Sequence, residues 1–516
     1  MKPVMLCVFS TWILSLTAAA ADRPNVIVIY TDDQGFGDTS YLNPDAKFQT
    51  PNLDRIASEG IAFTNAHSAD SVCTPSRYGL LTGRYCWRTT RKKGVLGAEA
   101  PCLIPDDRLT LASLLQQNGY RTAMFGKWHL GMDFPGEPGQ RDWTKPVQDM
   151  PLDKGFDHFF GVPASLNFGV LAWFENRFPQ TPPTLYTAKK PNPRYLDYRI
   201  QPPYQTTPEA TQQALGKPGM EVAPDFVDNL CLTRFTNEAL TWIKTHQQDA
   251  KSDKPFFVYL AMTSPHYPVC PLPQFHGQGA CGAYGEFVIE TDHHVGRLLQ
   301  YLDEAGLADN TLVIYTSDNG PENSWRSRIE DFQHDSRGRF RGGKRDIYEG
   351  GHRLPFFVRW PKRIAKPGRT YDGLVGQVDV LATLAELIEA ELPSEVAEDS
   401  QSFLSVLLNA QAQPQRAPLI NHAANGRFAV TDGHWKLVMP HRDQTDELYN
   451  LADDETESQN LASQHPDKVK ELTEAISRII CNGRSTPGPR VDNDTGYWQD
   501  LAWLTKDEYE RRSTNR

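Results

Sequence analysis

No long hydrophobic run occurs after the N-terminal 21 residues, because charged residues or proline interrupt every later apolar stretch. A helix that crosses a bilayer needs about 20 apolar residues, so we expect no membrane span in the mature chain. Positive charge is also scarce: 53 Lys and Arg against 64 Asp and Glu leave a net charge of −11. This balance argues against a general nucleic-acid-binding protein, although a local cationic pocket can still bind an anion. The sequence shows no internal repeat and no low-complexity tract.

The N-terminus has the pattern of a secretory signal peptide. Lys2 supplies a positive charge, residues 4–16 are mostly apolar, and residues 18–21 are alanines that suit cleavage. We therefore predict a signal peptide over residues 1–21 and export to the periplasm or the extracellular space. The remaining chain is long enough for two parts. We predict a catalytic domain over residues 22–405 and a smaller α+β subdomain with the polar C-terminal tail over residues 406–516.

Eight cysteines occur in the chain, and export permits them to form disulfides. Cys7 falls in the predicted signal peptide, and Cys73 belongs to the motif described below. Six cysteines remain, and spacing alone cannot fix how they pair. The pairings with short loops, Cys86 with Cys102 and Cys270 with Cys281, are the ones we expect.

Polar side chains follow three runs of apolar, partly β-branched residues. Such continuous runs at residues 25–30, 256–261 and 311–316 are typical of strands buried on both faces of a parallel sheet. Ligands bind beyond the carboxyl ends of such strands. The first run leads to Asp32 and Asp33, the second to His266 and the third to Asp318 and Asn319. The carboxylate and amide oxygens among these side chains are ligands that Ca²⁺ or Mg²⁺ prefers. Taken singly, each acid could instead belong to an Asx turn and His266 could be a packed structural histidine.

A second set of candidates combines a cysteine with cations. In Cys73-Thr-Pro-Ser-Arg77 the proline suits the first turn of a helix, whose N-terminus favours an anion, and Arg77 returns to the same side one turn later. Lys127 and His129 are two residues apart and share a face if that segment is extended. Lys344 follows a glycine pair that permits close approach to a ligand. The alternatives are a buried or disulfide-bonded cysteine, a solvated lysine beside a surface histidine, and a flexible basic loop.

The sequence also predicts a loop-rich stretch in the middle of the chain and a hairpin and a helix near the C-terminus. Residues 135–224 are rich in proline and aromatic residues, and we expect long loops with few regular elements. Near the C-terminus, Asp432-Gly-His434 between two apolar runs predicts a hairpin, and residues 466–480 predict a helix. The tail after residue 482 is polar, and we expect it to run over the surface.

Three stretches resemble one known family. CTPSRYGLLTGR, residues 73–84, resembles the first signature of the type I sulfatases, and FGKWHLG, residues 125–131, resembles the second. DELYNLADDETESQNLA, residues 446–462, looks like the family's C-terminal subdomain. The resemblance implies an α/β fold, the alkaline-phosphatase-like sandwich with a large central mixed sheet, plus a smaller C-terminal α+β subdomain. It also implies that a formylglycine-generating maturation enzyme oxidises Cys73 to Cα-formylglycine.

The resemblance further assigns a site. A formylglycine hydrate carries two hydroxyls, of which one attacks sulfur and the other later expels sulfate. Arg77 and the two lysines would offset charge in the transition state, His129 would act as a base and His266 as an acid at the leaving oxygen. The implied ligands of Ca²⁺, with Mg²⁺ as second choice, are Asp32, Asp33, Cys73, Asp318 and Asn319, and the implied pocket residues are Arg77, Lys127, His129, His266 and Lys344.

The expected activity is hydrolysis of a sulfate ester, on a sulfated saccharide or an aryl sulfate. A phosphomonoesterase or phosphonate hydrolase on the same scaffold is one alternative, and a non-catalytic glycan-binding protein is another. Because the sulfate pocket must be common to all substrates, we expect surrounding loops to choose the sugar. The candidates for that rim are Asn167, Trp173, Glu175, Trp325, Arg326, His334, Asp335 and His352.

Overall fold

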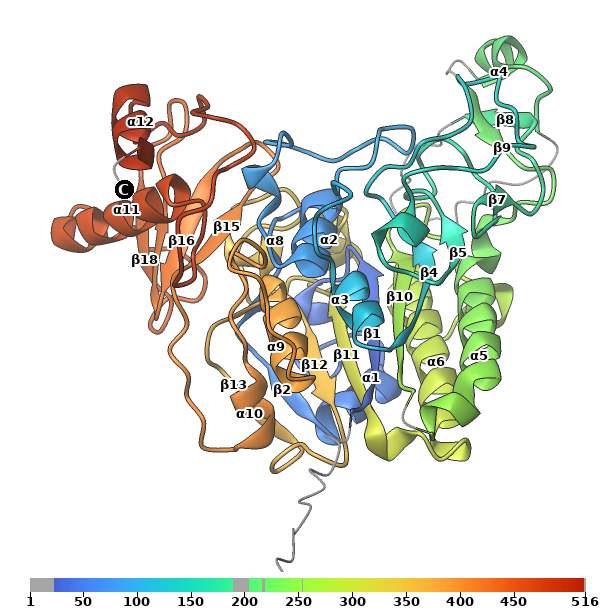
Figure 1. Ribbon diagram of the computed structural model, residues 1–516, viewed down its shortest axis with the longest axis horizontal. Coiled ribbons are helices and arrows are strands. Elements are labelled where there is room, and N and C mark those ends of the chain that lie inside the picture. Colours follow the sequence, from blue (N-terminus) through green and yellow to red (C-terminus); the bar gives the residue numbers. More distant parts are fainter. Residues whose placement is uncertain (1–22, 189–203, 216–218, 253, 515–516) are drawn as a thin grey trace, which may run out of the picture.

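A mixed β-sheet of ten strands forms the centre of the protein (Figure 1), in a computed structural model that describes residues 23–188, 204–215, 219–252 and 254–514. The predicted signal peptide lies outside the described residues. Along the sheet the strands are β13 (Arg369–Tyr371), β2 (Ile61–Phe63), β12 (Phe356–Arg359), β11 (Thr311–Ser317), β1 (Asn25–Asp32), β10 (Phe256–Pro265), β4 (Arg121–Lys127), β5 (His158–Val162), β6 (Phe174–Glu175) and β7 (Phe178–Pro179).

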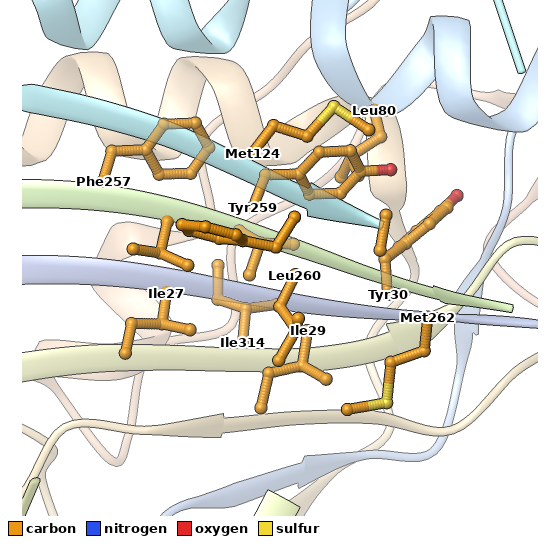
Figure 2. Packing of buried hydrophobic residues seen from close by; sticks show 14 of the residues in the cluster. Ile27, Ile29, Tyr30, Leu80, Met124, Phe257, Tyr259, Leu260, Met262 and Ile314 are labelled. Carbon is orange, nitrogen blue, oxygen red and sulfur yellow. The ribbon is translucent and has the colours of Figure 1, made fainter. Parts of the chain in front are cut away.

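The middle of this sheet is parallel, as the apolar runs predict. β1 pairs in parallel with both β10 and β11, and β10 pairs in parallel with β4. Every residue of β1, β10 and β11 is buried, which explains why their sequences are apolar without alternation. Figure 2 shows Leu80 of the helix α2 (Cys73–Thr82) next to Met124 and Tyr259 on one side of the strands, while Ile29 and Met262 point to the other side.

Helices cover the sheet in two groups, so the chain has the predicted α/β sandwich. In the first group α6 packs on α1 and α5, and α5 and α6 both contact β10. In the second group α2, α3 and α9 pack on one another. The bounds are α1 (Pro51–Ser58), α5 (Cys231–Ala250) and α6 (Gly282–Glu304), and α2 (Cys73–Thr82), α3 (Leu111–Gln117) and α9 (Val380–Leu387).

A smaller antiparallel sheet forms the C-terminal part (Figure 1), with strand order β15-β16-β17-β18. The predicted hairpin is β16 and β17, and the predicted helix is α11, which packs on both strands. Trp87 from the larger part lies 5.3 Å from the ring of Phe428 in the same apolar cluster. The bounds are β15 (Leu419–His422), β16 (Phe428–Asp432), β17 (Trp435–Val438), β18 (Glu447–Asn450), α11 (Pro466–Cys481) and α12 (Lys506–Thr514).

Three expectations about the framework are wrong. The tail does not merely run over the surface, because Leu501, Leu504 and Tyr509 are buried in the C-terminal cluster. No disulfide joins the seven described cysteines, from Cys73 to Cys481, so neither expected disulfide is present. The stretch 135–224 is more regular than expected: it holds β5 to β7 and, in its described part, β8 (Leu185–Ala188), α4 (Pro208–Leu215) and β9 (Gly219–Val222).

Two further features bear on the sequence predictions. Among the described residues, no helix combines the length and the apolar character needed to cross a membrane. The helix α10 (Leu404–Leu408) spans the expected boundary between residues 405 and 406 and contributes Leu404 and Leu407 to the main core. The division into two domains at that position stays a prediction.

Candidate active site

Two neighbouring strands bring the acidic residues together. β1 ends at Asp32, β11 ends one residue before Asp318, and the two strands pair in parallel as far as Thr31 opposite Ser317. The backbone N–H of Asp33 donates to Asp318 Oδ1 at 3.1 Å. Asn319 Nδ2 donates to Asp33 Oδ1 at 2.7 Å. All four side chains are buried, so the residues expected to hold a metal do meet at one edge of the sheet.

Cys73 reaches the same place from the first residue of α2. Its Sγ and single carboxylate oxygens of Asp32 and Asp318 all lie within 4.8 Å of one another. As the motif predicts, α2 begins at Cys73, with Pro75 in its first turn; it ends at Thr82, and the next residue, Gly83, caps it with a left-handed φ of +62°. The helix N-terminus therefore directs its backbone N–H groups and partial positive charge at this cluster.

Three cations neutralise the three carboxylates. Lys127 Nζ lies 2.6 Å from Asp32 Oδ2, and Lys344 Nζ lies 2.6 Å from Asp33 Oδ1. The Arg77 guanidinium donates to Asp318 Oδ2 at 2.8 Å. Glu322 and Arg345, which lie beside Lys344, cancel each other's charge, so a divalent cation would make the centre net positive and suited to an anion.

The donor set fits a hard divalent cation. Asp32 Oδ1 and Asn319 Oδ1 are buried, and neither accepts a hydrogen bond from any described residue; such buried acceptors call for a partner. Burial raises the pKa of Asp33 and of Asp318, whereas for Asp32 the attraction of Lys127 and Arg77 outweighs burial and lowers the pKa. Carboxylate and amide oxygens suit Ca²⁺ or Mg²⁺ better than zinc.

The two predicted histidines lie at this centre, each with one nitrogen fixed by a carbonyl. His129 Nε2 lies 2.9 Å from Leu96 O, so Nε2 carries the hydrogen and Nδ1 keeps the lone pair. His266 Nδ1 donates to Tyr267 O at 2.6 Å, which leaves Nε2 facing Asp33 Oδ2 at 3.7 Å. Burial lowers the pKa of His266 to about 3 and holds that of His129 well below its usual value, so both are neutral.

The reason for expecting Lys127 and His129 together was wrong, although both side chains lie in the site. The segment is not extended at His129, whose φ of +61° is left-handed. The chain turns there, and the backbone carbonyl of His129 accepts a hydrogen bond from Thr74 Oγ1 at 3.1 Å. That contact ties the second signature to the helix that carries Cys73.

The unmodified thiol of Cys73 is a poor nucleophile in this setting. Burial raises its pKa to about 11, although Lys127 and Lys344 act in the opposite direction. The thiolate is the reactive form of cysteine, so at neutral pH almost none of it is present. The geometry and this pKa therefore do not favour catalysis by the unmodified thiol of Cys73.

Several of the rim residues expected from sequence are instead structural. Trp173 is 1% exposed and packs 4.6 Å from the ring of Phe226. His334 is fully buried and bonded to Asp38 at 2.8 Å. Sequence gave no sign of this burial, because loop residues of these types are usually exposed. Asn167 and Trp325 are also buried, whereas Glu175, Arg326 and Asp335 are exposed or half-buried.

His352, the remaining rim candidate, belongs to a buried polar group elsewhere. Its Nδ1 lies 2.9 Å from His67 Nδ1, and together with Glu349 the two histidines resemble a metal site. Lys436 Nζ, however, lies 2.9 Å from Glu349 Oε1 and 3.1 Å from His352 Nε2. The lysine ammonium already supplies the positive charge there, so this group links the C-terminal sheet to α8 (Glu349–His352).

Sequence reasoning missed three residues at the site. The ring of Tyr30 lies under the Arg77 guanidinium, 5.3 Å from its centre. Glu322 Oε2 lies 3.8 Å from Lys344 Nζ and also pairs with Arg345. Only their positions in the sequence could have indicated these residues. Tyr30 ends an apolar run, Glu322 follows Asp318-Asn-Gly-Pro321, and Arg345 follows Lys344.

Comparison with known proteins decides the family. A family model described as Sulfatase matches residues 24–390, well over half of the 516 residues. The chain belongs to the sulfatase family. A second model, described as the C-terminal part of N-sulphoglucosamine sulphohydrolase, matches residues 338–482 of this sulfatase.

Curated relatives of the sulfatase are similar over nearly their whole length. An N-acetylgalactosamine-6-O-sulfatase of Bacteroides thetaiotaomicron is 32% identical over 495 residues, which cover 89% of this chain and 93% of the relative. Arylsulfatase A of Homo sapiens is 32% identical over 497 residues, which cover 90% of this chain and 89% of the relative. The sulfatase is therefore an enzyme that hydrolyses sulfate esters.

Solved structures confirm the fold. One from work on glycosaminoglycan metabolism by Bacteroides thetaiotaomicron has a TM-score of 0.76 at 31% identity, covering 89% of this chain and 99% of that one. A phosphonate monoester hydrolase from Silicibacter pomeroyi has a TM-score of 0.60 at 17% identity, covering 92% and 100%, and this likeness concerns the fold alone. The predicted alkaline-phosphatase-like α/β fold is confirmed.

Proposed function

We propose that this sulfatase removes sulfate from a sulfated carbohydrate, using a formylglycine made from Cys73 and one Ca²⁺, with Mg²⁺ as second choice. The observation that carries the proposal is the meeting of Cys73 Sγ with the oxygens of Asp32 and Asp318 within 4.8 Å. Asp32, Asp33, Asp318, Asn319 and residue 73 would hold the metal. When present, the aldehyde hydrate and the metal would supply an oxygen nucleophile and an electrophilic anchor for sulfate.

The side chains of the site have distinct tasks in this proposal. Arg77, Lys127 and Lys344 bind the sulfate oxygens and offset negative charge as the S–O bond to the sugar breaks. Each is held by a carboxylate at 2.6 to 2.8 Å, so the cations are positioned before substrate arrives.

The two histidines move protons. His129 keeps the lone pair on Nδ1, which is buried and accepts no hydrogen bond from a described residue, so it suits a general base of the site. His266 Nε2 suits the acid that protonates the leaving oxygen. That task requires an added proton on His266, which the negative charge of a bound sulfate ester favours.

The substrate class, the cell compartment and the maturation partner belong to the same proposal. Relatives of similar sequence are named for sulfated N-acetylgalactosamine and for aryl sulfates, which supports a sulfated saccharide as substrate and an aryl sulfate as a small surrogate. The N-terminal signal pattern supports export to the periplasm or the extracellular space. A formylglycine-generating enzyme would have to act on Cys73 before the site closes around it, because the residue is 2% exposed in the folded chain.

Comparative kinetics test the proposed function. The matured protein is assayed with an aryl sulfate, the matching aryl phosphate and phosphonate monoester, and position-defined sulfated saccharides. We expect kcat/KM to favour sulfate, with no turnover in Cys73→Ala. Cys86→Ala is the matched control, because Cys86 is also 2% exposed but lies outside the site. Preference for phosphate or phosphonate, or full activity of Cys73→Ala, would reject the proposal.

A further inference from the structure

Arg345 occupies an unusual backbone position at the edge of the site. Its φ is +79°, in the left-handed region that favours glycine over residues with a side chain. Its backbone N–H donates to Ser71 O at 2.9 Å, two residues before Cys73. The strained residue is therefore fixed between the segment that carries Lys344 and the segment that carries Cys73. Strain of this kind points to a residue whose side chain is needed where it lies.

The guanidinium of Arg345 is half-exposed but held in place. Its Nη1 and Nη2 donate to Glu322 Oε1 and Oε2 at 2.6 and 2.8 Å, and the arginine side chain is 45% exposed. These two hydrogen bonds use two of the five guanidinium N–H groups. The other three N–H groups donate to no acceptor among the described residues. Glu322 also lies 3.8 Å from Lys344 Nζ, so one carboxylate aligns the pocket lysine and the outer arginine.

The position of Arg345 separates it from the other arginines of the same stretch. The hydrogen bonds to Glu322 raise the pKa of Arg345, and the charge of Asp33 is near enough to add to that rise. Arg339 is exposed to a similar extent, 49%, and is also paired with a carboxylate, Glu455. Arg345 thus places a guanidinium just outside the pocket in which Arg77, Lys127 and Lys344 would bind the sulfate that is removed.

We propose that Arg345 is a specificity-determining residue that binds a second anionic group of the substrate, a carboxylate or another sulfate next to the one removed. The inference rests on the proposed function. A guanidinium pairs with either anion through two parallel N–H groups, and Glu322 keeps it oriented before the sugar binds. The substrate class is then a saccharide with at least two negative groups close together.

The test compares three disaccharides: one with a single sulfate, one with an added carboxylate and one with a second sulfate. Their dissociation constants are measured by calorimetry on the Cys73→Ala protein, so that binding is read without turnover. Adding Arg345→Gln should weaken binding of at least one doubly charged ligand about tenfold relative to the singly charged one. Arg345→Lys should lose less, and Arg339→Gln should leave the ratio unchanged.

Two results would overturn the assignment. One is a ratio that Arg345→Gln leaves unchanged, and the other is an equal change in Arg339→Gln. The two added groups separate a carboxylate from a sulfate as the natural partner. Hydrolysis of an aryl sulfate by the matured wild-type protein is measured alongside, so a failure of the proposed sulfatase chemistry shows as lost turnover, while a failure of the Arg345 assignment shows only in the ratio of dissociation constants.

Discussion

Replacing Lys436 with methionine should destabilise the protein more than any surface lysine change. Lys436 Nζ lies 2.9 Å from Glu349 Oε1 and 2.8 Å from Glu457 Oε1, and all three side chains are fully buried. Lys436→Met would leave two buried carboxylates without their shared cation. Removing one partner from a buried ionic group costs about 3–5 kcal/mol. With roughly 1 kcal/mol of unfolding free energy per degree for a chain of this size, Tm should fall by about 3–5 °C.

The loss should also depend on pH. Burial raises the pKa of Glu457 to about 7 even with Lys436 in place, and the nearby Glu349 adds to the rise. A carboxyl whose folded-state pKa is raised stabilises the fold below its unfolded pKa, and that contribution is lost as pH rises through about 7. Without the lysine a proton binds Glu457 still more readily. Lys436→Met should therefore lower Tm less at pH 6 than at pH 8.

Thermal unfolding followed by circular dichroism at both pH values measures the effect. The matched control is Lys468→Met, because Lys468 is 29% exposed and its ion pair with Glu471 lies at the surface. Exposed pairs contribute about 0–1 kcal/mol, so its Tm should change by roughly 1 °C or less. Equal losses in the two variants, or a loss in Lys436→Met that is the same at both pH values, would refute the reasoning.

Three further predictions follow from the fold and the site. A reducing agent should leave Tm unchanged, because no disulfide joins the described cysteines; a fall in Tm would mean that a disulfide forms. Leu504→Ala should cost about 2–5 kcal/mol in unfolding free energy, since Leu504 is 3% exposed, whereas Leu408→Ala, at a residue 37% exposed, should change little. Removing Ca²⁺ and Mg²⁺ with a chelator should abolish sulfate release, and Ca²⁺ but not Zn²⁺ should restore it; activity that survives chelation would contradict the metal assignment.

The sheet and the acids at its edge could be read from the sequence because both are local. An apolar run without alternation requires a strand buried on both faces, and the acid that follows it must lie at a carboxyl end. Parallel pairing of β1 with β11 then places Asp33 and Asp318 side by side. The helix start at Cys73 was equally local, since Pro75 fits only the first turn.

What the sequence did not reveal depends on contacts between distant segments. His334 and Trp173 looked like exposed loop residues, but partners far along the chain bury them. The left-handed turn at His129 and the buried Leu504 likewise arise from tertiary packing. The sequence did not mark Arg345 as a candidate, apart from its position after Lys344. Its placement depends on hydrogen bonds to Glu322 and to the backbone of Ser71, which lie elsewhere in the sequence.

The chemical state of residue 73 in active enzyme tests the central claim most directly. Protein produced with and without a formylglycine-generating enzyme is digested, and the peptide that contains residue 73 is analysed by mass spectrometry while sulfate release is measured on the same samples. We predict that the fraction carrying the aldehyde in place of the thiol rises in proportion to turnover and approaches zero in inactive samples. Full turnover by protein whose residue 73 is entirely an unmodified thiol would contradict the account.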